Sequence, residues 1–421
     1  MNKFDYTVQE ARLIKSQNNS KLKKVLSRFI VYLVLWLSSF LSRFFLKQKK
    51  NINHKFVFMG RFESNNWIAA HIKPIALSNV CEHIWIVSDE KMLDIENVSY
   101  VIPSSKVRKI FGSVIARFYT TYKIAKKNQV GYVGGFHLLL NGIFSHVIAK
   151  MNGAQSIYFC VGGWSEIIGG GVYSGTPIFK DIGKRDVVLE KKLLDYIKKI
   201  DYVITMGNKA KSYLVNEGGN DRISVNPGGI DPNIFEWSLK KDKDIDLILI
   251  ARLDPVKRID RFLKIVKKLK VQLPYISAVV VGGGSQLNDY VSLSRKLGLS
   301  DNVKFIGEKT HVVSYLSRSR VFVLTSDSEG LPLSCMEAAT LGIPIVASDV
   351  GDLSDLVISG KTGFLIQKDS IDDFVSKINR LLTDDELFDS ISLAARRKSK
   401  DFTVCASSCL WDLILRKRGE V

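Results

Sequence analysis

Short apolar runs alternate with longer segments of helical periodicity along most of the chain after residue 55. The runs are rich in Val, Ile and Leu, and several end in glycine or a polar residue. Continuous runs of this kind predict parallel strands in a sheet that helices cover on both faces. A first series comprises residues 56–60, 84–88, 130–135, 156–163 and 202–207, and a second comprises residues 246–251, 276–284, 303–307, 321–326, 344–348 and 363–367.

Two such series predict two similar α/β domains, each with a doubly wound sheet. Helical patterns such as residues 258–270 separate the runs, and right-handed crossovers then place helices on both faces. Ligands of such sheets bind beyond the carboxyl ends of the strands, so we expect the site in a cleft between two facing Rossmann-like domains. The expected segments are residues 1–50, an N-terminal domain at 51–235, a C-terminal domain at 236–400, and a helix at 401–421 that packs back on the N-terminal domain.

The first fifty residues form a segment of different character. Residues 29–42 carry no charge, but a membrane span needs about 20 apolar residues, and residues 25–46 include Arg28 and Arg43. Positive residues lie on both sides of the run, whereas a spanning helix usually shows a one-sided bias. We interpret the segment as a helix lying in the cytoplasmic membrane interface. A single span and a helix buried against the protein remain alternatives.

The charge of the chain supports an anionic partner. Its 421 residues hold 61 Lys and Arg against 42 Asp and Glu, a net charge of +19. Nearly half of that excess falls in residues 1–50, so a membrane surface is favoured over nucleic acid, for which the sequence shows no recognised module. Five cysteines without a CxxC spacing indicate neither a disulfide framework nor a zinc site, and favour a reducing cytosolic compartment.

The segment of residues 324–352 carries the strongest chemical signal. A predicted strand leads into a polar loop and a helical pattern that begins after Gly330, Leu331 and Pro332. We expect Pro332 in the first helical turn, where its missing N–H costs nothing. The free N–H groups of such a helix start favour an anion such as a diphosphate.

Two carboxylates accompany this helix start. Glu329 precedes it, and Glu337 lies in its second turn, about 8–10 Å further along. Together they could hold the hydroxyl-rich ends of a sugar nucleotide. A helix-capping charge for Glu329 and a solvated helix face for Glu337 are the structural alternatives.

Two further groups follow predicted strands of the same domain. Arg252 and Lys257 leave a strand end, and guanidinium and ammonium groups are the usual partners of phosphate. Residues 282–284 are glycines that permit close approach of backbone or ligand. Residues 244–246 read Asp-Ile-Asp, but they precede a strand, so we expect linker charge and no metal site.

Taken together, these motifs resemble the retaining glycosyltransferases of family 4, which have the GT-B fold. The resemblance covers about residues 223–368. It is carried by residues 225–235, 251–260, 279–286 and 359–366 and by the E-x7-E pattern of Glu329 and Glu337.

The resemblance implies roles for individual residues. Arg252 and Lys257 would bind the donor diphosphate and stabilise the leaving group. Glu329 would lie near the transferred sugar, and Glu337 would bind the ribose hydroxyls. Backbone of Gly330, Leu331 and Pro332 would approach the sugar and phosphates, and the loop from Gly307 to Lys309 would lie by the nucleobase.

Three positions depart from the pattern of the family. Ala251 and Arg258 stand where glycine is common, and Asp352 replaces the second glycine of a pair. None of them touches a charged catalytic position, so we expect an active enzyme.

The N-terminal half matches the family less closely. Gly60 ends the first strand, in a loop that approaches the donor phosphates in the family. His137 follows a strand end where the family often has a histidine beside the acceptor and the transferred sugar; a loop-stabilising imidazole is the alternative. The glycine-rich residues 162–177 predict a mobile loop, with Trp164 and Tyr173 able to stack on a sugar ring and Glu166 able to contact the acceptor.

A second basic helix is expected in this half. Residues 106–127 predict an amphipathic helix with an apolar stripe, which is most simply a core face but could also meet lipid through its lysines.

The sequence therefore predicts a retaining glycosyltransferase at the cytoplasmic membrane face. It would move a sugar from a UDP- or GDP-sugar to a lipid-linked saccharide or other glycan, with no metal and no further cofactor. A sugar-nucleotide epimerase or phosphorylase of the same fold is one alternative, and a non-catalytic membrane-bound scaffold is another.

Overall fold

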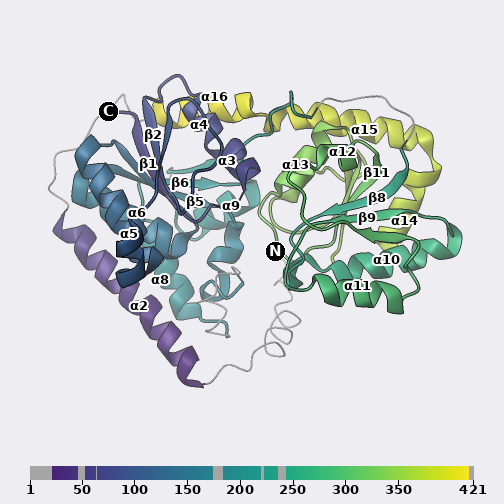
Figure 1. Ribbon diagram of the computed structural model, residues 1–421, viewed down its shortest axis with the longest axis horizontal. Helices are drawn as coiled ribbons and strands as arrows, with labels where there is room; N and C mark the ends of the chain where they lie inside the picture. Colours follow the sequence, from purple (N-terminus) through teal and green to yellow (C-terminus); the bar gives the residue numbers. More distant parts are fainter. Residues whose placement is uncertain are drawn as a thin grey trace. The chain divides into compact units, whose positions relative to one another are not determined.

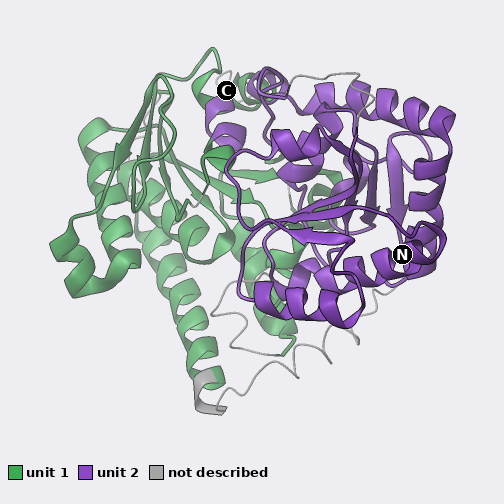
Figure 2. Ribbon diagram, turned by 45° about the vertical axis from the view of Figure 1, so that its right-hand side comes forward, with its two compact units in different colours: residues 1–68, 75–226, 410–421 green, residues 69–74, 227–409 purple. Residues whose placement is uncertain are grey.

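The computed structural model describes residues 21–45, 53–62, 64–173, 184–219, 222–235 and 243–416. The chain divides into two compact units, which we describe separately (Figure 2). Unit 1 comprises residues 1–68, 75–226 and 410–421, and unit 2 comprises residues 69–74 and 227–409. The division falls after Asn226 rather than after residue 235, because residues 227–235 belong to unit 2.

Unit 1 is built on a parallel sheet of order β3-β2-β1-β4-β5-β6-β7 (Figure 1). Its chain order reverses between β1 and β4, which pair with each other in parallel. The strands are β1 (Lys55–Met59), β2 (His83–Val87), β3 (Val98–Val101), β4 (Tyr132–Phe136), β5 (Gln155–Cys160), β6 (Tyr202–Thr205) and β7 (Ile223–Val225).

Helices flank this sheet, and an additional helix precedes it. They are α2 (Lys21–Phe44), α3 (Asn65–His71), α4 (Lys73–Ala76), α5 (Ser105–Asn128), α6 (Ile143–Asn152), α8 (Val187–Ile197) and α9 (Asn208–Asn216). Residues 69–74 of α3 and α4 group with unit 2, where the Gly229 N–H donates to the Ala70 carbonyl at 2.9 Å. The expected helix over 106–127 is confirmed, with a break at Gly112, whose φ is 78°.

Unit 2 repeats the same plan with a sheet of order β10-β9-β8-β11-β12-β13. Its strands are β8 (Ile245–Ile250), β9 (Ala278–Val281), β10 (Val303–Phe305), β11 (Ser319–Leu324), β12 (Ile345–Ser348) and β13 (Gly363–Ile366). Its helices are α10 (Ile259–Gln272), α11 (Leu287–Lys296), α12 (Val313–Leu316), α13 (Leu333–Thr340), α14 (Ile371–Thr383) and α15 (Asp385–Ser399).

Each unit has its own core. Apolar residues at a spacing of three and four on α10 and α14, such as Phe262, Val266, Phe374 and Ile378, pack on buried strand residues of unit 2. In unit 1, one cluster joins residues of α2, α6 and α8 with β5 and β6, and a second joins residues of α5 and α6 with β1, β2 and β4. Two doubly wound Rossmann-like α/β units are thus confirmed, whereas a cleft between them stays a prediction.

The last helix, α16 (Val404–Arg416), starts in unit 2 and ends in unit 1. Its Trp411 is 2% exposed and lies 5.7 Å from the Phe159 ring, and Asp412 accepts hydrogen bonds from Asn79. The second half of the helix therefore packs on unit 1. The remaining residues of the expected 401–421 helix, 417–421, lie outside the described residues, as do residues 1–20 and 46–52 of the expected N-terminal segment.

Candidate functional site

The first group of predicted residues gathers where the strand order of unit 2 reverses, between β8 and β11. Ligands of doubly wound sheets bind at this switch point, beyond the carboxyl ends of the strands. Arg252 follows β8, and a 3-10 turn at Pro255–Lys257 directs Lys257 toward the loop after β11. The Lys257 Nζ lies 2.6 and 2.8 Å from the two carboxylate oxygens of Glu329. The structure thus brings together two residues that are 72 positions apart in the chain.

The Lys257–Glu329 ion pair is largely buried from solvent, whereas the Arg252 side chain is exposed. The side chains of Lys257 and Glu329 are 16% and 8% exposed, whereas that of Arg252 is 73% exposed, with only a 3.5 Å contact to Asp254. A charged pair of low exposure interacts more strongly than a surface pair, since the surrounding dielectric constant is lower. An anionic ligand here would meet one preorganised ammonium group and one guanidinium group free to reach it.

A second charged network, which the sequence did not reveal, holds the turn of Lys257 in place. Arg258 forms a two-pronged contact with Asp260, at 2.8 Å for each nitrogen, and reaches Asp327 at 3.2 Å. Arg261, whose side chain is 2% exposed, donates to Asp327 and Asp369 at 2.9 Å each. These contacts fasten the turn after β8 to the loop after β11, and so set the distance between Lys257 and Glu329.

The backbone at Arg258 explains one departure from the family pattern. Its φ of 52° and ψ of 49° are left-handed values, which glycine adopts without cost. Here arginine takes that conformation, and its side chain gains the contacts with Asp260 and Asp327. Burial opposes these charges, but the neighbouring guanidinium holds the pKa of Asp260 below its usual range.

The start of α13 differs from the expectation in one respect. Pro332 has φ −67° and ψ 131°, so it is the capping residue before the helix and not part of its first turn. Its carbonyl accepts from the Cys335 N–H at 3.1 Å, an interaction that a residue in extended conformation can make at a helix start. Leu331 is buried, and Gly330 is half-buried.

A tight backbone crossing supports this loop. The φ of Gly351 is 56°, and a Cβ there would lie 2.1 Å from the Glu329 carbonyl oxygen, so only glycine fits. The Asp352 N–H donates to the Gly330 carbonyl at 2.9 Å. The substituted position 352 thus keeps a backbone contact that steadies the loop.

Glu337 lies in α13 with only 4% exposure, which contradicts the alternative of a solvated helix face. Burial raises the pKa of its carboxyl group to about 7, because the charged form loses its hydration. The other donor-side residues, Gly307 and Lys309, follow β10; Gly307 has φ 70°, and its carbonyl accepts from Gly282. Lys309 is exposed.

Unit 1 carries its predicted residues at the equivalent switch point, between β1 and β4. Gly60 follows β1 and lies against the Phe62 ring, and His137 follows β4 with a left-handed φ of 64°. The His137 side chain is 50% exposed, and its Nδ1 lies 2.9 Å from the Glu166 Oε1. One ring nitrogen of His137 therefore faces a carboxylate.

Glu166 does not lie open to an acceptor as expected. Its side chain is 3% exposed and accepts hydrogen bonds from the Leu138 and Gly162 N–H groups at 3.0 and 2.6 Å and from the Tyr158 hydroxyl at 2.8 Å. Burial alone would raise the pKa of Glu166, but His137 and these donors outweigh it and lower the pKa. The Glu166 carboxylate is therefore ionised and in contact with His137, so its role is to position the histidine ring.

The structure describes the glycine-rich loop up to Tyr173. Trp164 lies in a 3-10 turn, Gly163–Glu166, and meets the Tyr213 ring edge-on at 6.0 Å. Trp164 and Tyr173 are both half-buried. Residues 174–177 of the expected loop lie outside the described residues, so its mobility and its stacking on a sugar stay predictions.

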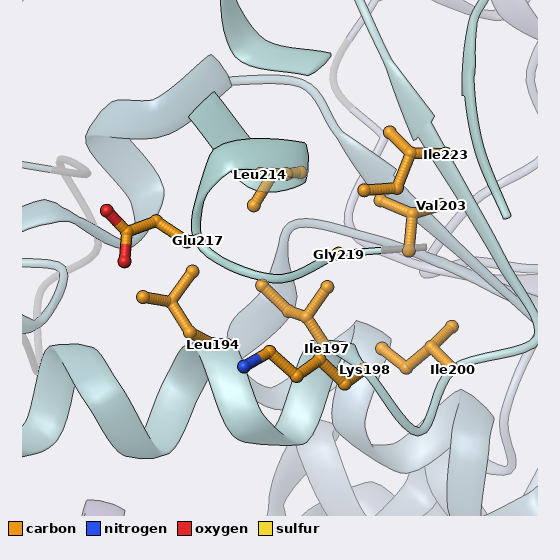
Figure 3. Close-up of a pocket in the computed structure, with 9 residues that line it drawn as sticks. All are labelled: Leu194, Ile197, Lys198, Ile200, Val203, Leu214, Glu217, Gly219 and Ile223. Carbon is orange, nitrogen blue, oxygen red and sulfur yellow. The ribbon is translucent and has the colours of Figure 1, made fainter. Parts of the chain in front are cut away.

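Neither a crevice in unit 1 nor the Asp-Ile-Asp sequence offers a competing site. The crevice between α8, α9 and β7 has a volume of about 10 Å³, which is room for about one water molecule, and Leu194, Ile197 and Leu214 point into it (Figure 3). Asp244 pairs with Arg318, and Asp246 accepts from Ser277 at the start of β8. Within the described ranges, no three His, Cys, Asp or Glu residues form a group that could hold a metal ion.

Sequence reasoning missed three groups: Asp327, Arg261 and Tyr158. Asp327 and Arg261 act through hydrogen bonds between segments far apart in the chain, and Tyr158 through a hydrogen bond from its buried hydroxyl to Glu166; no local sequence pattern reveals these contacts. The one available signal was Arg258 at a position where glycine is common, since such a substitution indicates a side chain with a compensating contact.

Comparison with known proteins supports a glycosyltransferase domain in the second half of the chain. Residues 231–398 match the family Glycosyl transferases group 1. The chain is 28% identical to the UDP-Gal:alpha-D-GlcNAc-diphosphoundecaprenol alpha-1,3-galactosyltransferase of Escherichia coli over 66% of this chain and 72% of that protein. It is 25% identical to the O-antigen biosynthesis glycosyltransferase WbnH of Escherichia coli over 76% of this chain and 86% of that protein.

The fold has solved neighbours as well. HepE of Anabaena, solved in complex with UDP-glucose, superposes with a TM-score of 0.66 and 16% identity, over 86% of this chain and 99% of that one. Two switch-point sheets and these similarities define a glycosyltransferase of the GT-B type. The similarity to the glycosyl transferases group 1 covers residues 231–398 of the chain.

Proposed function

We propose that the protein transfers a sugar from a nucleoside-diphosphate sugar to a hydroxyl of a lipid-linked saccharide at the cytoplasmic face of a membrane, with retention of anomeric configuration. The observation that carries the proposal is the Lys257–Glu329 contact beside the exposed Arg252 at the switch point of unit 2. It supplies two cations and a carboxylate within one loop cluster of a glycosyltransferase domain.

In this proposal Arg252 and Lys257 bind the donor diphosphate. As the bond from the anomeric carbon to the phosphate oxygen breaks, negative charge grows on the leaving group, and the two cations stabilise it. The acceptor oxygen bonds to the same face of the anomeric carbon, and its proton passes to the leaving phosphate. Glu329 faces the transferred sugar, His137 faces its hydroxyls, and Glu337 accepts from the ribose hydroxyls.

Named relatives favour particular substrates. A UDP-sugar is the favoured donor, because one relative is named for UDP-Gal and HepE was solved with UDP-glucose. A lipid-linked acceptor is favoured because the same relative is named for a diphosphoundecaprenol substrate. No metal is required in this proposal, since the two cations neutralise the diphosphate.

Thermal unfolding with a panel of UDP-, GDP- and ADP-sugars, with and without EDTA, tests the donor site, because a ligand that binds only the folded state raises its stability. We expect one nucleotide to raise the melting temperature and EDTA to leave that shift unchanged. A shift that EDTA abolishes would disprove metal independence. If no nucleotide shifted the transition, also with lipid acceptor present, the non-catalytic scaffold would be the better assignment.

Turnover of the responsive donor tests the roles of the cations. Arg252→Ala and Lys257→Ala should each lower kcat at least about 100-fold, the scale for loss of one transition-state donor. Lys304→Ala, which alters an exposed cation of the same unit outside the predicted site, should leave kcat near the wild-type value. Near-normal rates in the first two variants would contradict the phosphate assignment. The anomeric configuration of the product, read by NMR, distinguishes retention from inversion.

A further inference from the structure

Helix α2 has two faces of different character. Five residues at a spacing of three and four are buried: Ser27, Val31, Leu35, Ser38 and Ser42. The opposite side, here called the outer face, carries large apolar residues that are exposed: Val25, Leu26, Phe29, Ile30, Leu33, Trp36, Leu37, Phe40, Leu41 and Phe44. Phe29, Trp36 and Phe44 are 61%, 63% and 75% exposed. So large an apolar surface is unusual in contact with water and indicates a partner.

The inner face is fastened to unit 1 along the helix, which runs along the outside of that unit (Figure 1). Val31 and Leu35 belong to the same core cluster as residues of α6 and α8. Arg28 pairs with Asp186 at 2.8 Å, and the Lys199 Nζ donates to the Ser39 Oγ at 3.0 Å. Asp186 in turn caps α8 by accepting from the Leu189 N–H. Helix α2 is therefore part of the folded unit.

Length alone would allow α2 to cross a membrane. Residues Lys24–Phe44 have a mean hydropathy of 1.8 in their most apolar window, and 21 residues of helix extend about 31 Å. A crossing would, however, either strip α2 from its core partners or draw α8 into the hydrocarbon. Helix α8 carries Glu190, Lys191, Lys192 and Asp195, and charged groups are costly at that depth.

We propose that α2 lies in the plane of an anionic membrane surface, with its outer face among the acyl chains and headgroups and its inner face on unit 1. This inference deepens the proposed function by naming a membrane-surface partner, and it rests on that function only for the nature of the acceptor. Charge complementarity selects the partner: the 24 residues of α2 include five Lys and Arg and no Asp or Glu. An apolar face bordered by cations is typical of interfacial helices.

The neighbouring helix α5 supplies a second membrane contact. Both helices pack against α6. The 24 residues of α5 contain seven Lys and Arg and no acid, and Ile110, Phe111 and Ile115 are 71%, 59% and 53% exposed. The helix is broken at Gly112, where a Cβ would meet nothing within 4 Å, next to these exposed residues. Two basic, apolar helix surfaces on one unit would hold it at a fixed orientation on lipid.

Point variants test the surface better than deletion, because removing α2 would expose the core beneath Val31 and Leu35. Phe29→Glu combined with Phe40→Glu changes only the outer face. We expect the full-length double variant to bind phosphatidylglycerol-containing vesicles at least 10-fold more weakly than the wild type, with unchanged thermal unfolding. Binding of the wild type should weaken with added salt and on pure phosphatidylcholine vesicles. Ile110→Glu with Phe111→Glu should weaken it too.

The matched control is Leu393→Glu with Leu413→Glu, which alters two exposed apolar residues of α15 and α16, 47% and 57% exposed. It should bind vesicles as the wild type does. The assignment of the outer face would be overturned if the α2 double variant bound vesicles as tightly as the wild type. It would also be overturned if the control variant lost as much vesicle binding as the α2 double variant.

A topology measurement separates an interfacial helix from a span. In a chain that carries Cys405→Ser and Cys409→Ser at the two exposed cysteines, Lys21→Cys introduces a reporter at the start of α2. A membrane-impermeant maleimide should label it in inverted membrane vesicles and not in intact cells. Labelling in intact cells would mean a crossing helix and overturn the inference. UDP-sugar binding, measured separately on the wild type and on the outer-face variant, tests the donor site independently of the membrane. If only the membrane inference fails, both proteins still bind the UDP-sugar; if the donor site fails, neither does.

Discussion

At the scale of single residues, Glu166 is the side chain whose role the structure changes most. It touches His137 and three other donors while almost fully buried. Glu166→Gln replaces two accepting oxygens with one accepting oxygen and one NH2 group that donates. Either His137 or one of the buried donors then loses its acceptor. We expect kcat to fall 10- to 100-fold, on the scale of losing an orienting partner, with little change in the donor KM.

Two comparisons make this prediction specific. Glu190→Gln, which alters a carboxylate that contacts Gly169 and Tyr213 but not His137, should leave kcat within about threefold of the wild type, as a change away from the reacting groups. Since Glu166 acts through His137, the double variant with His137→Ala should be no slower than His137→Ala alone. Additive losses in the double variant would show that Glu166 has a separate role.

Glu337 gives a prediction about pH. In the folded chain its carboxyl group has a pKa of about 7, against an ordinary value of 4.5. Between these values the folded state holds a proton that the unfolded state has lost, so the free energy of unfolding falls as pH rises from about 4.5 to 7 and then levels off. The loss amounts to about 3 kcal/mol. The side chain in Glu337→Gln does not titrate, so the stability of this variant relative to the wild type should increase as pH rises from about 4.5 to 7. Urea unfolding at a series of pH values measures this difference in stability. A difference that did not change with pH would contradict the raised pKa.

At the scale of elements, the turn between β8 and α10 combines strain with compensation. A left-handed non-glycine residue costs about 1 kcal/mol or more, and Arg258 offsets this through Asp260 and Asp327. Arg258→Gly and Arg258→Ala both lose these contacts, but only Ala keeps the strain. We expect the Gly variant to be more stable by about 1 kcal/mol in urea unfolding. Equal stabilities would mean that the turn relaxes once the guanidinium is gone.

The same elements show what a sequence can predict. All eleven expected strands are present, because buried parallel strands read as continuous apolar runs. Strands β3 and β7 were not predicted, because both are short strands at the edges of the sheet and β3 is only half-buried along its length. Lys257 and Glu329 were predicted individually, yet their contact depends on the network of Arg258, Arg261 and Asp327. That network joins loops about seventy residues apart, which periodicity and spacing cannot reveal.

At the scale of the whole molecule, the two units have separate cores. The main cluster of unit 2 and the two clusters of unit 1 share no residue. Helix α2 is part of unit 1 through Val31 and Leu35, so the helix that we propose to lie on the membrane contributes to the stability of that unit. The predicted diphosphate-binding cations, Arg252 and Lys257, lie in the other unit. This division allows each unit to be followed on its own during unfolding.

We therefore expect calorimetry to resolve two transitions, of which a UDP-sugar raises mainly the one that belongs to unit 2. Leu249→Ala in the core of unit 2 and Leu193→Ala in that of unit 1 identify the transitions, since each truncation should cost its own unit about 2–5 kcal/mol. Donor at 100 times its Kd should stabilise unit 2 by about 2.7 kcal/mol. Lys257→Ala should reduce that shift. A donor that raised the transition marked by Leu193→Ala instead would place the main donor contacts at Gly60 and His137 and refute the assignment to Lys257 and Glu329.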